Sequence, residues 1–437
     1  MVRRRQAAGA DKVGQARRGV LPCRVSLSAP PPPEAPARVL PLIVLAQLLG
    51  TSTWFAVNAV MPDLQRAFGW DAAAVGTLTS ALQAGFIAGT LVFALLAMAD
   101  RFPARRVFFV CALAASACTL AAVALAESFW ALIACRAMTG FFLAGIYPVG
   151  MKITAQWFPR GLGGALGWLV GALVLGSASP HGLRAMGAAW PWEHVFIGVA
   201  AAVAFAGVLV IALVPEPPAL PVAPAAPAAP AAPPARAAEA TLRVSALAIL
   251  WRDGRVRASA LGYFGHMWEL YTVWVLVPFV LATRLVSGAA VSGWAFGVIA
   301  AGALGCVVGG LLARRVGGAR VASSQLATSS LCCLAAPWML QAPLPLFLAW
   351  LVLWGVTVAG DSPQFSALTA VNAPREAVGS VLTLSNSIGF AISAVSIELF
   401  VRLAQTVALA QLLPWLAVGP VLGLLAMRPL LARRSAR

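Results

Sequence analysis

The sequence predicts an all-α polytopic membrane protein with twelve transmembrane helices in two pseudo-symmetric six-helix bundles. Of its 437 residues, 61% are hydrophobic and only 10% are charged, and the mean hydropathy is +0.87. Soluble domains are about 45–50% apolar and about 25% charged, so the composition excludes that class. Long uncharged runs and a similarity between the two halves of the chain complete the prediction.

The apolar residues fall in twelve stretches, each long enough for a helix that crosses a bilayer, which needs about 20 residues. We expect all of them to be helical, because lipid offers the backbone no hydrogen-bond partner. The tenth stretch continues past Asp361. The predicted spans are 39–62, 72–99, 107–126, 128–151, 161–183, 195–214, 258–283, 285–313, the two parts of 321–360 that flank 341–345, 377–397 and 403–427.

The basic residues predict the orientation of the chain. The net charge is +17, and with the N-terminus in the cytoplasm 26 of the 31 Lys and Arg residues lie on cytoplasmic segments. This excess is the positive-inside rule, so it calls for no nucleic-acid partner. We therefore predict an integral protein of a bacterial cytoplasmic (inner) membrane with both termini cytoplasmic. The five remaining arginines are Arg66, Arg184, Arg284 and Arg402 outside, and Arg136 within the fourth span.

An Ala/Pro-rich stretch divides the spans six and six. Arg101 recurs 214 residues on as Arg315, and Pro159-Arg160 recurs 215 residues on as Pro374-Arg375. Parallel six-span repeats around a central site are typical of transporters. The predicted organisation is a disordered cytoplasmic tail at 1–38, a first bundle at 39–214, a cytoplasmic linker and basic segment at 215–257, a second bundle at 258–428 and a cytoplasmic tail at 429–437.

Charges in the loop between the second and third spans form a motif. Residues 96–106 read LAMADRFPARR, and 310–320 read GLLARRVGGAR at the equivalent place in the second half. The first stretch resembles the signature of the major facilitator superfamily, G-x-x-x-D-R-x-G-[RK]-[RK], with Leu96 and Pro103 in place of its glycines. The resemblance covers the chain after residue 38, and it implies charge pairs that close a cytoplasmic gate. The alternative is that these charges only fix the topology. The gate candidates are Asp100, Arg101, Arg105, Arg106, Arg314 and Arg315.

The fourth span carries a second motif. Arg136, Gly140 and Ala144 match the family pattern R-x-x-x-G-x-x-x-A, and their spacing of four places them on one helix face. The small residues allow a neighbouring helix to approach closely. The resemblance implies that Arg136 takes part in proton coupling, and the alternative is that Arg136 reaches the outer surface. The fifth-span motif of the family's drug/proton antiporters is incomplete, because Ser177 replaces its proline and the terminal glycine pair is missing.

The seventh span holds two ionisable residues that predict a proton relay. His266 and Glu269 are three residues apart and share a helix face with Tyr263. Glu269 lies near mid-membrane at about 1.5 Å per residue, where a carboxyl group can carry a proton. Histidine titrates near neutral pH. The alternative is a purely structural polar network between helices.

Five further polar residues in the spans are candidates for the same central site. Asp361 and Gln364 flank Pro363, which is expected to kink the tenth span and to open a cavity there. The others could bind the solute or simply hold helices together. They are Trp54 and Asn58 in the first span, Tyr147 in the fourth and Asn386 in the eleventh.

We expect neither a metal nor another cofactor. No residue cluster has metal-ligand spacing and no glycine-rich loop follows a strand, which argues against ATP-driven transport by this chain. His181, just past Pro180, is interpreted as a structural histidine rather than a ligand, and the cysteines within spans as small buried residues. Glu398 and Arg402, four apart near an outer end, are predicted to pair.

The sequence therefore predicts a secondary transporter, not an enzyme, which takes up a small organic solute with protons by alternating access. Its partners would be the solute, protons and the lipid bilayer, and the family resemblance implies a monomer. Arg136 and the incomplete antiporter motif favour an anionic solute. The alternative is proton-driven efflux of cationic or amphipathic compounds attracted by Glu269 and Asp361. A membrane sensor or a polytopic membrane enzyme is disfavoured, since the sequence has neither a receiver domain nor a recognisable acid, base and nucleophile set.

Overall fold

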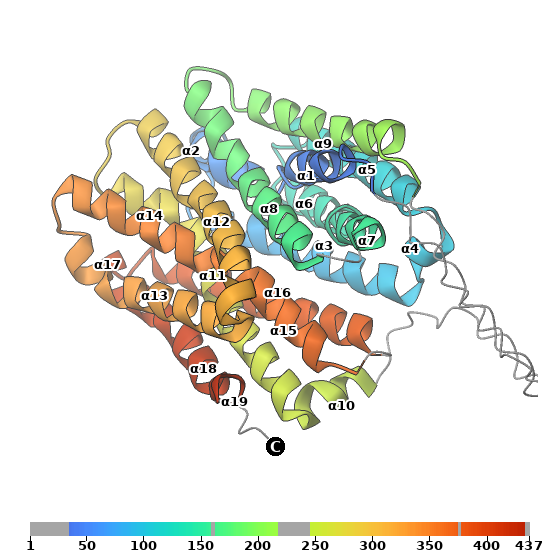
Figure 1. The fold of residues 1–437 in the computed structure, drawn as a ribbon. Coiled ribbons are helices and arrows are strands. Elements are labelled where there is room, and N and C mark those ends of the chain that lie inside the picture. Colours follow the sequence, from blue (N-terminus) through green and yellow to red (C-terminus); the bar gives the residue numbers. More distant parts are fainter. Residues whose placement is uncertain (1–34, 159–161, 217–244, 375–376, 433–437) are drawn as a thin grey trace, which may run out of the picture. The chain divides into compact units, whose positions relative to one another are not determined.

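Every regular element in the part of the chain that the structure describes is a helix (Figure 1). The structure is a computed structural model, and it describes residues 35–158, 162–216, 245–374 and 377–432. The first half contains α1 (Val39–Gly50), α2 (Ala56–Phe68), α3 (Ala74–Leu95), α4 (Met98–Arg101), α5 (Ala104–Ala124), α6 (Phe129–Leu143), α7 (Tyr147–Trp157), α8 (Leu162–Met186) and α9 (Glu193–Leu213). The second contains α10 (Ser245–Arg252), α11 (Gly254–Ala282), α12 (Gly288–Val316), α13 (Gly318–Met339), α14 (Leu344–Gly360), α15 (Ser362–Asn372), α16 (Val378–Leu403), α17 (Leu409–Leu412), a 3₁₀ helix (Leu413–Ala417), α18 (Val418–Ala426) and α19 (Arg428–Leu431).

The predicted helical membrane fold is confirmed. Within the described ranges, ten spans are long and apolar enough to cross a membrane by themselves. The other two predicted spans are the first and the ninth. The first consists of α1 and α2, which together form a broken helix, and the ninth is α13. α13 has sufficient length, but Arg320, Gln325 and four serines make it less apolar than its neighbours.

Several predicted span boundaries move in the structure; span four ends at Trp157 rather than at 151, and span eleven ends at Leu403 rather than at 397. The seventh span begins at Gly254, where the side chain of Asp253 accepts hydrogen bonds from the backbone of Arg255 and Val256. This N-cap starts the helix four residues before the predicted position of 258. The preceding basic segment, within the predicted linker 215–257, forms the short helix α10. The rest of the linker, residues 217–244, lies outside the described residues.

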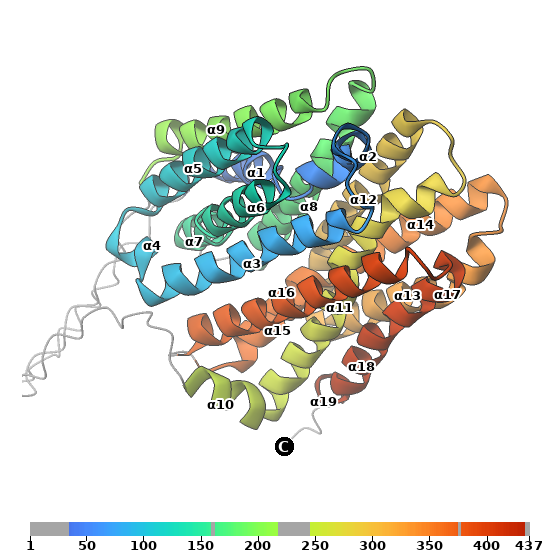
Figure 2. The same cartoon turned by 180° about the vertical axis from the view of Figure 1, so that it is seen from behind.

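The helices of each half pack mainly on one another, and the halves meet along two seams. In the first half α3 packs on α6 and α5 on α9, and in the second half α12 packs on α14 and α11 on α16 and α18. One seam joins α8 to α12, and the other joins α3 to α16 (Figures 1 and 2). The α3–α16 seam is polar, since Gln83 donates to Ser393 at 3.2 Å and Thr77 donates to Glu398.

Three spans are broken near their middles. Span one is unwound at residues 51–55, between α1 and α2. Span four breaks before Tyr147, between α6 and α7, and span ten breaks at Asp361, between α14 and α15. Ile146 and Asp361 are 215 positions apart, which is the spacing of the sequence repeat. The repeat therefore places equivalent breaks in spans four and ten.

Glycines in the same two spans allow backbones to touch. A Cβ atom on Gly140 of α6 would lie 1.9 Å from the carbonyl oxygen of Leu82 in α3. Gly355 of α14, 215 positions later, is equally close to the carbonyl oxygen of Val298 in α12. The glycine of the fourth-span motif thus sits at a helix crossing that only glycine fits, and the second half repeats this crossing.

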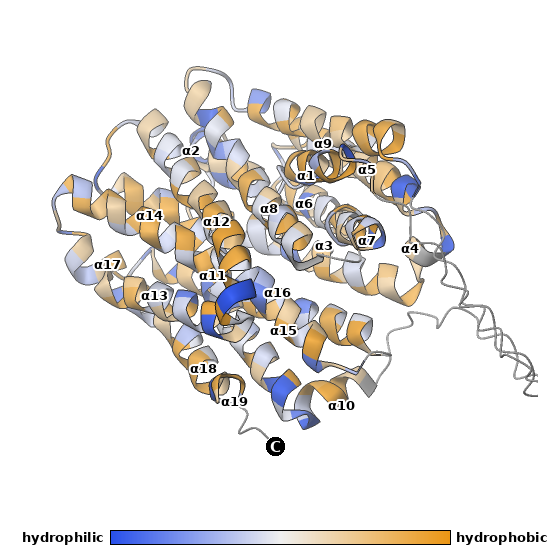
Figure 3. Cartoon of the chain, viewed as in Figure 1, coloured by the Kyte–Doolittle hydropathy of each residue, from blue (hydrophilic) through white to orange (hydrophobic). Residues whose placement is uncertain are grey.

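The outer surfaces of the helices are suited to lipid. Large apolar side chains such as Trp130, Leu331 and Leu422 are well exposed, and hydrophobic residues dominate along most helices (Figure 3). Hydrophilic residues gather at helix ends, as in α10 (Figure 3). In a bilayer these apolar faces would contact acyl chains.

Replacing Gly140 by leucine is expected to push α6 away from α3 and to lower the free energy of unfolding by about 1–3 kcal/mol. Gly297→Leu is the matched control, because no atom lies within 4 Å of a Cβ at that α12 position. Thermal unfolding of both variants in detergent measures the difference. Equal midpoints for the two variants would contradict the tight crossing.

Candidate functional site

Arg136 holds the unwound segment of span one. Its Nη1 donates to the carbonyl of Thr53 at 2.9 Å, and its Nη2 donates to the carbonyl of Trp54 at 2.7 Å. The residue is 1% exposed, so it does not reach the surface, and that alternative from the sequence is wrong. Among the described residues no carboxylate pairs with it. The guanidinium thus replaces the hydrogen-bond donors that a continuous helix would have supplied to these carbonyls.

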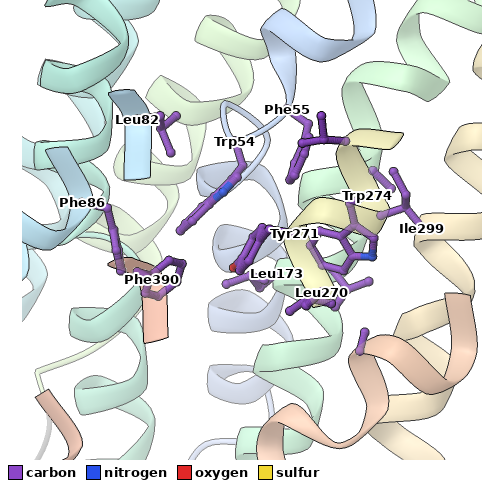
Figure 4. Close-up of a cluster of buried hydrophobic side chains, with 14 of the residues drawn as sticks. Trp54, Phe55, Leu82, Phe86, Leu173, Leu270, Tyr271, Trp274, Ile299 and Phe390 are labelled. Carbon is purple, nitrogen blue, oxygen red and sulfur yellow. The ribbon is translucent and has the colours of Figure 1, made fainter. Parts of the chain in front are cut away.

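An aromatic cluster joins the two halves beside this break. Trp54 stacks on Tyr271 of α11 with ring centroids 5.5 Å apart and an interplanar angle of 19°, and lies 5.6 Å from the ring of Phe390 in α16. Phe55 packs on Tyr271 and Trp274 (Figure 4). Arg136 therefore fixes, through the backbone, the residue that contacts both α11 and α16.

His266 and Asp361 form a buried pair at the break of span ten. The Nδ1 atom of His266 lies 2.8 Å from Oδ1 of Asp361, and the two side chains are 1% and 0% exposed. The other ring nitrogen, Nε2, has no hydrogen-bond partner among the described residues. The ring packs between Tyr263 and Phe365. A buried ionisable pair at a helix junction can change its charge by gaining or losing a proton.

Glu269 lies one helical turn further along α11 and is held by three donors. Its Oε1 accepts hydrogen bonds from the hydroxyl of Ser329, from the thiol of Cys333 at 3.1 Å and from the indole of Trp354 at 2.7 Å. The residue is buried, and it interacts electrostatically with Asp361. The sequence predicts that Glu269 and His266 act together. The structure places both in one group with Asp361, although no direct hydrogen bond joins Glu269 to His266. We call His266, Glu269 and Asp361 the buried acid group.

The remaining candidates lie at different depths around this group. Asn58 donates to Thr79 of α3 at 3.1 Å. Tyr147 and Tyr263 lie close enough to each other to interact electrostatically, and both interact with Tyr271, so all three tyrosines of the chain gather in the centre. Gln364 is buried in α15. Asn386 is only half-buried in α16, and no hydrogen bond joins it to the described residues.

The gate candidates whose side chains the structure describes do not form one network. Arg105 donates to the carbonyl of Val214 at 2.7 Å and pairs with Glu216, so it caps the end of α9 within its own half. Arg314 crosses between the halves, with its guanidinium beside Gly164 of α8. The side chain of Asp100 lies outside the described residues. The three other candidates are exposed: Arg101, Arg106 and Arg315.

A cavity of about 880 Å³ lies between the two halves, at the end of the molecule where α2 and α11 end. Its wall comes from α2, α8, α11 and the starts of α3 and α12, and we call it the vestibule. Asn58 and Val275 line it, while Trp54 and Tyr271 lie four residues further inward on the same segments. The aromatic cluster therefore separates the vestibule from the buried acid group. Of the predicted central-site residues, Asn58 alone lines this cavity.

Sequence reasoning missed the partners of Glu269. Ser329 and Cys333 are four residues apart, on one face of α13, and Trp354 lies seven residues before Asp361 in span ten. The signal was available, since a membrane span as rich in serine as α13 points to buried hydrogen bonds. The cysteines had been interpreted only as small apolar residues.

The pairing of Glu398 with Arg402 is confirmed, with Nε of Arg402 2.6 Å from the carboxylate. Glu398 also accepts from Thr77, so this pair belongs to the α3–α16 seam.

Broken helices around buried ionisable groups, in two repeated halves, define a polytopic membrane transporter. The sequence profile of the Major Facilitator Superfamily matches residues 43–397, and the chain belongs to this family of secondary transporters. The family prediction is thereby confirmed, and the protein is a transporter rather than an enzyme.

Two solved structures share the fold. The human organic anion transporter MFSD10 (TETRAN) superposes with a TM-score of 0.68 at 18% identity, over 90% of this chain and 99% of that one. A bacterial homologue of the human lysosomal transporter Spinster, in an inward-facing and unoccupied conformation, gives a TM-score of 0.64 at 19% identity, over 91% of this chain and 98% of that one. No curated protein matches the sequence.

Substituting Arg136 by glutamine would leave at least one buried carbonyl of span one without a donor. We expect a loss of about 1–3 kcal/mol in the free energy of unfolding, with partial recovery in Arg136→Lys. Arg402→Gln serves as the control, since it removes an exposed arginine. Unfolding midpoints in detergent report the effect, and an Arg136→Gln variant as stable as the control would refute the clamp.

Proposed function

We propose that this transporter is a proton-coupled symporter that takes up a small organic solute by alternating access. We further propose that it resides as a monomer in a bacterial cytoplasmic membrane. Both termini would lie in the cytoplasm, an orientation that the distribution of basic residues supports. The vestibule then opens to the outside. The observation that carries the proposal is the buried contact between His266 and Asp361 at the break of span ten.

The buried acid group suits protons better than a cationic solute. The Oε1 atom of Glu269 already receives three hydrogen bonds, and Asp361 already faces His266. Neither carboxyl group lines the vestibule. A bulky organic cation would have to displace these partners, whereas a proton binds one oxygen without moving them. This favours symport over efflux of cationic compounds.

The position of Asp361 gives protonation a mechanical consequence. Asp361 is the junction between α14 and α15, and its carbonyl accepts from the backbone of Gln364 and Phe365 at the start of α15. A proton added to the pair with His266 changes the charge at this junction and hence the strength of the contact. Hinges at helix ends absorb such changes. In our proposal, proton binding at Asp361 or Glu269 biases the angle of span ten, and the bias favours one of the two access states.

Glu269→Gln tests the proton step. In liposomes containing the purified chain, we expect proton-coupled uptake of the transported solute to fall by about tenfold or more, because the amide cannot release a proton. Exchange of labelled for unlabelled solute should persist, since it requires no net proton transfer. A pH-sensitive dye inside the liposomes and pooled organic acids, neutral metabolites and cationic dyes outside provide the assay.

Glu127→Gln is the matched control, because Glu127 makes the same chemical change in an exposed turn between α5 and α6. Wild-type proton coupling in Glu269→Gln and in Asp361→Asn would refute the relay. Proton movement opposite to the solute, seen only with cationic dyes, would refute symport and establish efflux.

A further inference from the structure

The vestibule carries an unusual concentration of positive charge for its side of the membrane. Three of the four arginines that the topology places outside line it: Arg66, Arg184 and Arg284. The fourth, Arg402, pairs with Glu398 in the α3–α16 seam. Asp63 is the only acidic residue in the wall, so the lining side chains sum to a formal charge of +2. Orientation does not explain this, because arginine on the outer side opposes the positive-inside rule.

The arginines are fixed in place rather than free in solvent. Arg184 is mostly buried, contacts Asp63 at 2.8 Å and donates to the carbonyl of Trp190. Arg284 donates from Nη1 to the carbonyls of Leu340 and Ala342. Its Nε and Nη2 make no hydrogen bond to the described residues, so one edge of this guanidinium is available to a ligand.

His181 supplies an independent sign of a ligand. It is 1% exposed, lies in the vestibule wall and has no hydrogen-bond partner for Nε2 among the described residues. A buried polar atom without a partner is unfavourable unless a ligand or water completes it. The sequence alone favoured a purely structural histidine, but the unpartnered nitrogen in a cationic cavity favours the other interpretation.

Most of the rest of the wall is apolar, and its uncharged polar residues are Asn58, Gln65, Thr283, Ser287 and Ser292. Met61 and Val75 from the first half face Val275, Phe279 and Val291 from the second half. Pockets with a mostly apolar lining and a few fixed polar groups bind ligands that have an apolar body and a polar head. A volume of about 880 Å³ accommodates a small organic molecule.

We infer that the vestibule is a capture site for an amphipathic organic anion, with Arg284 and His181 binding its carboxylate and the apolar wall holding its body. The inference rests on the proposed function, since the captured anion would be the solute that is taken up. Arg136 is less suited to this role, because both terminal nitrogens of its guanidinium already donate to backbone carbonyls and only Nε is without a partner among the described residues. The vestibule, rather than Arg136, would select negative solutes.

Titration calorimetry on the full chain in phosphatidylcholine nanodiscs tests the inference. The probe is 3-phenylpropionate, and its matched cation is 3-phenylpropylammonium. We expect the acid to bind and the cation to bind at least about tenfold more weakly, because the lining charge is +2. Arg284→Gln should weaken binding of the acid by about tenfold or more, and Arg402→Gln, which removes an outer arginine outside the vestibule, should leave it unchanged.

Arg66→Gln guards against a folding defect in Arg284→Gln, since Arg66 is largely exposed and its loss leaves the Arg184–Asp63 pair intact. We expect about threefold weaker binding, because exposed charges contribute less. Equal binding of acid and cation, equal affinities in Arg284→Gln and Arg402→Gln, or no binding of the acid up to about 10 mM would each overturn the capture site.

Glu269→Gln separates this inference from the proposed function. We expect it to bind 3-phenylpropionate with wild-type affinity, since Glu269 does not line the vestibule. Binding with no proton-coupled flux in the wild-type protein would overturn the proposed function alone. Proton-coupled uptake that is unaffected by Arg284→Gln would overturn the capture site alone.

Discussion

Unpaired backbone groups at helix breaks are the constraint on which the centre of this protein depends. Lipid cannot hydrogen-bond them, so each break needs partners from within the protein. Arg136 supplies them for the carbonyls of span one. At span ten backbone hydrogen bonds complete the turn, and the side chain of Asp361 meets His266. Asp361 and the binding partners of Arg136 thus lie where helices are interrupted.

The two halves repeat geometry but not charge. The break at Asp361 corresponds to Ile146, and the glycine crossings at Gly140 and Gly355 also correspond. The ionisable residues do not, because the first half places at its centre an arginine that binds backbone carbonyls, and the second half places the buried acid group there. In the proposed function, protons bind only in the second half, while the first half contributes Trp54 and Phe55 to the aromatic cluster.

Much of the fold follows from composition, while the pairing of side chains does not. Span positions and the repeat could be predicted because they depend on one-dimensional features, namely apolar length and residue spacing. The close helix crossing at Gly140 also followed from its motif. The partners of Arg136 could not be predicted, because a carbonyl left free by an unwound segment has no signature in the sequence. The grouping of Arg66, Arg184 and Arg284 around one cavity depends on how helices from both halves converge.

The composition of α13 bears on how the chain enters the bilayer. Its four serines and Gln325 make it less apolar than the spans that qualify alone, yet it ends up packed against helices that bind its polar atoms. Trp350, which donates to the carbonyl of Cys332, is synthesised after it, and Arg284, which binds the carbonyls just beyond its end, is synthesised before it. It follows that α13 gains a stable place in the membrane only when spans seven and ten are beside it, so the second half is assembled as a group rather than helix by helix.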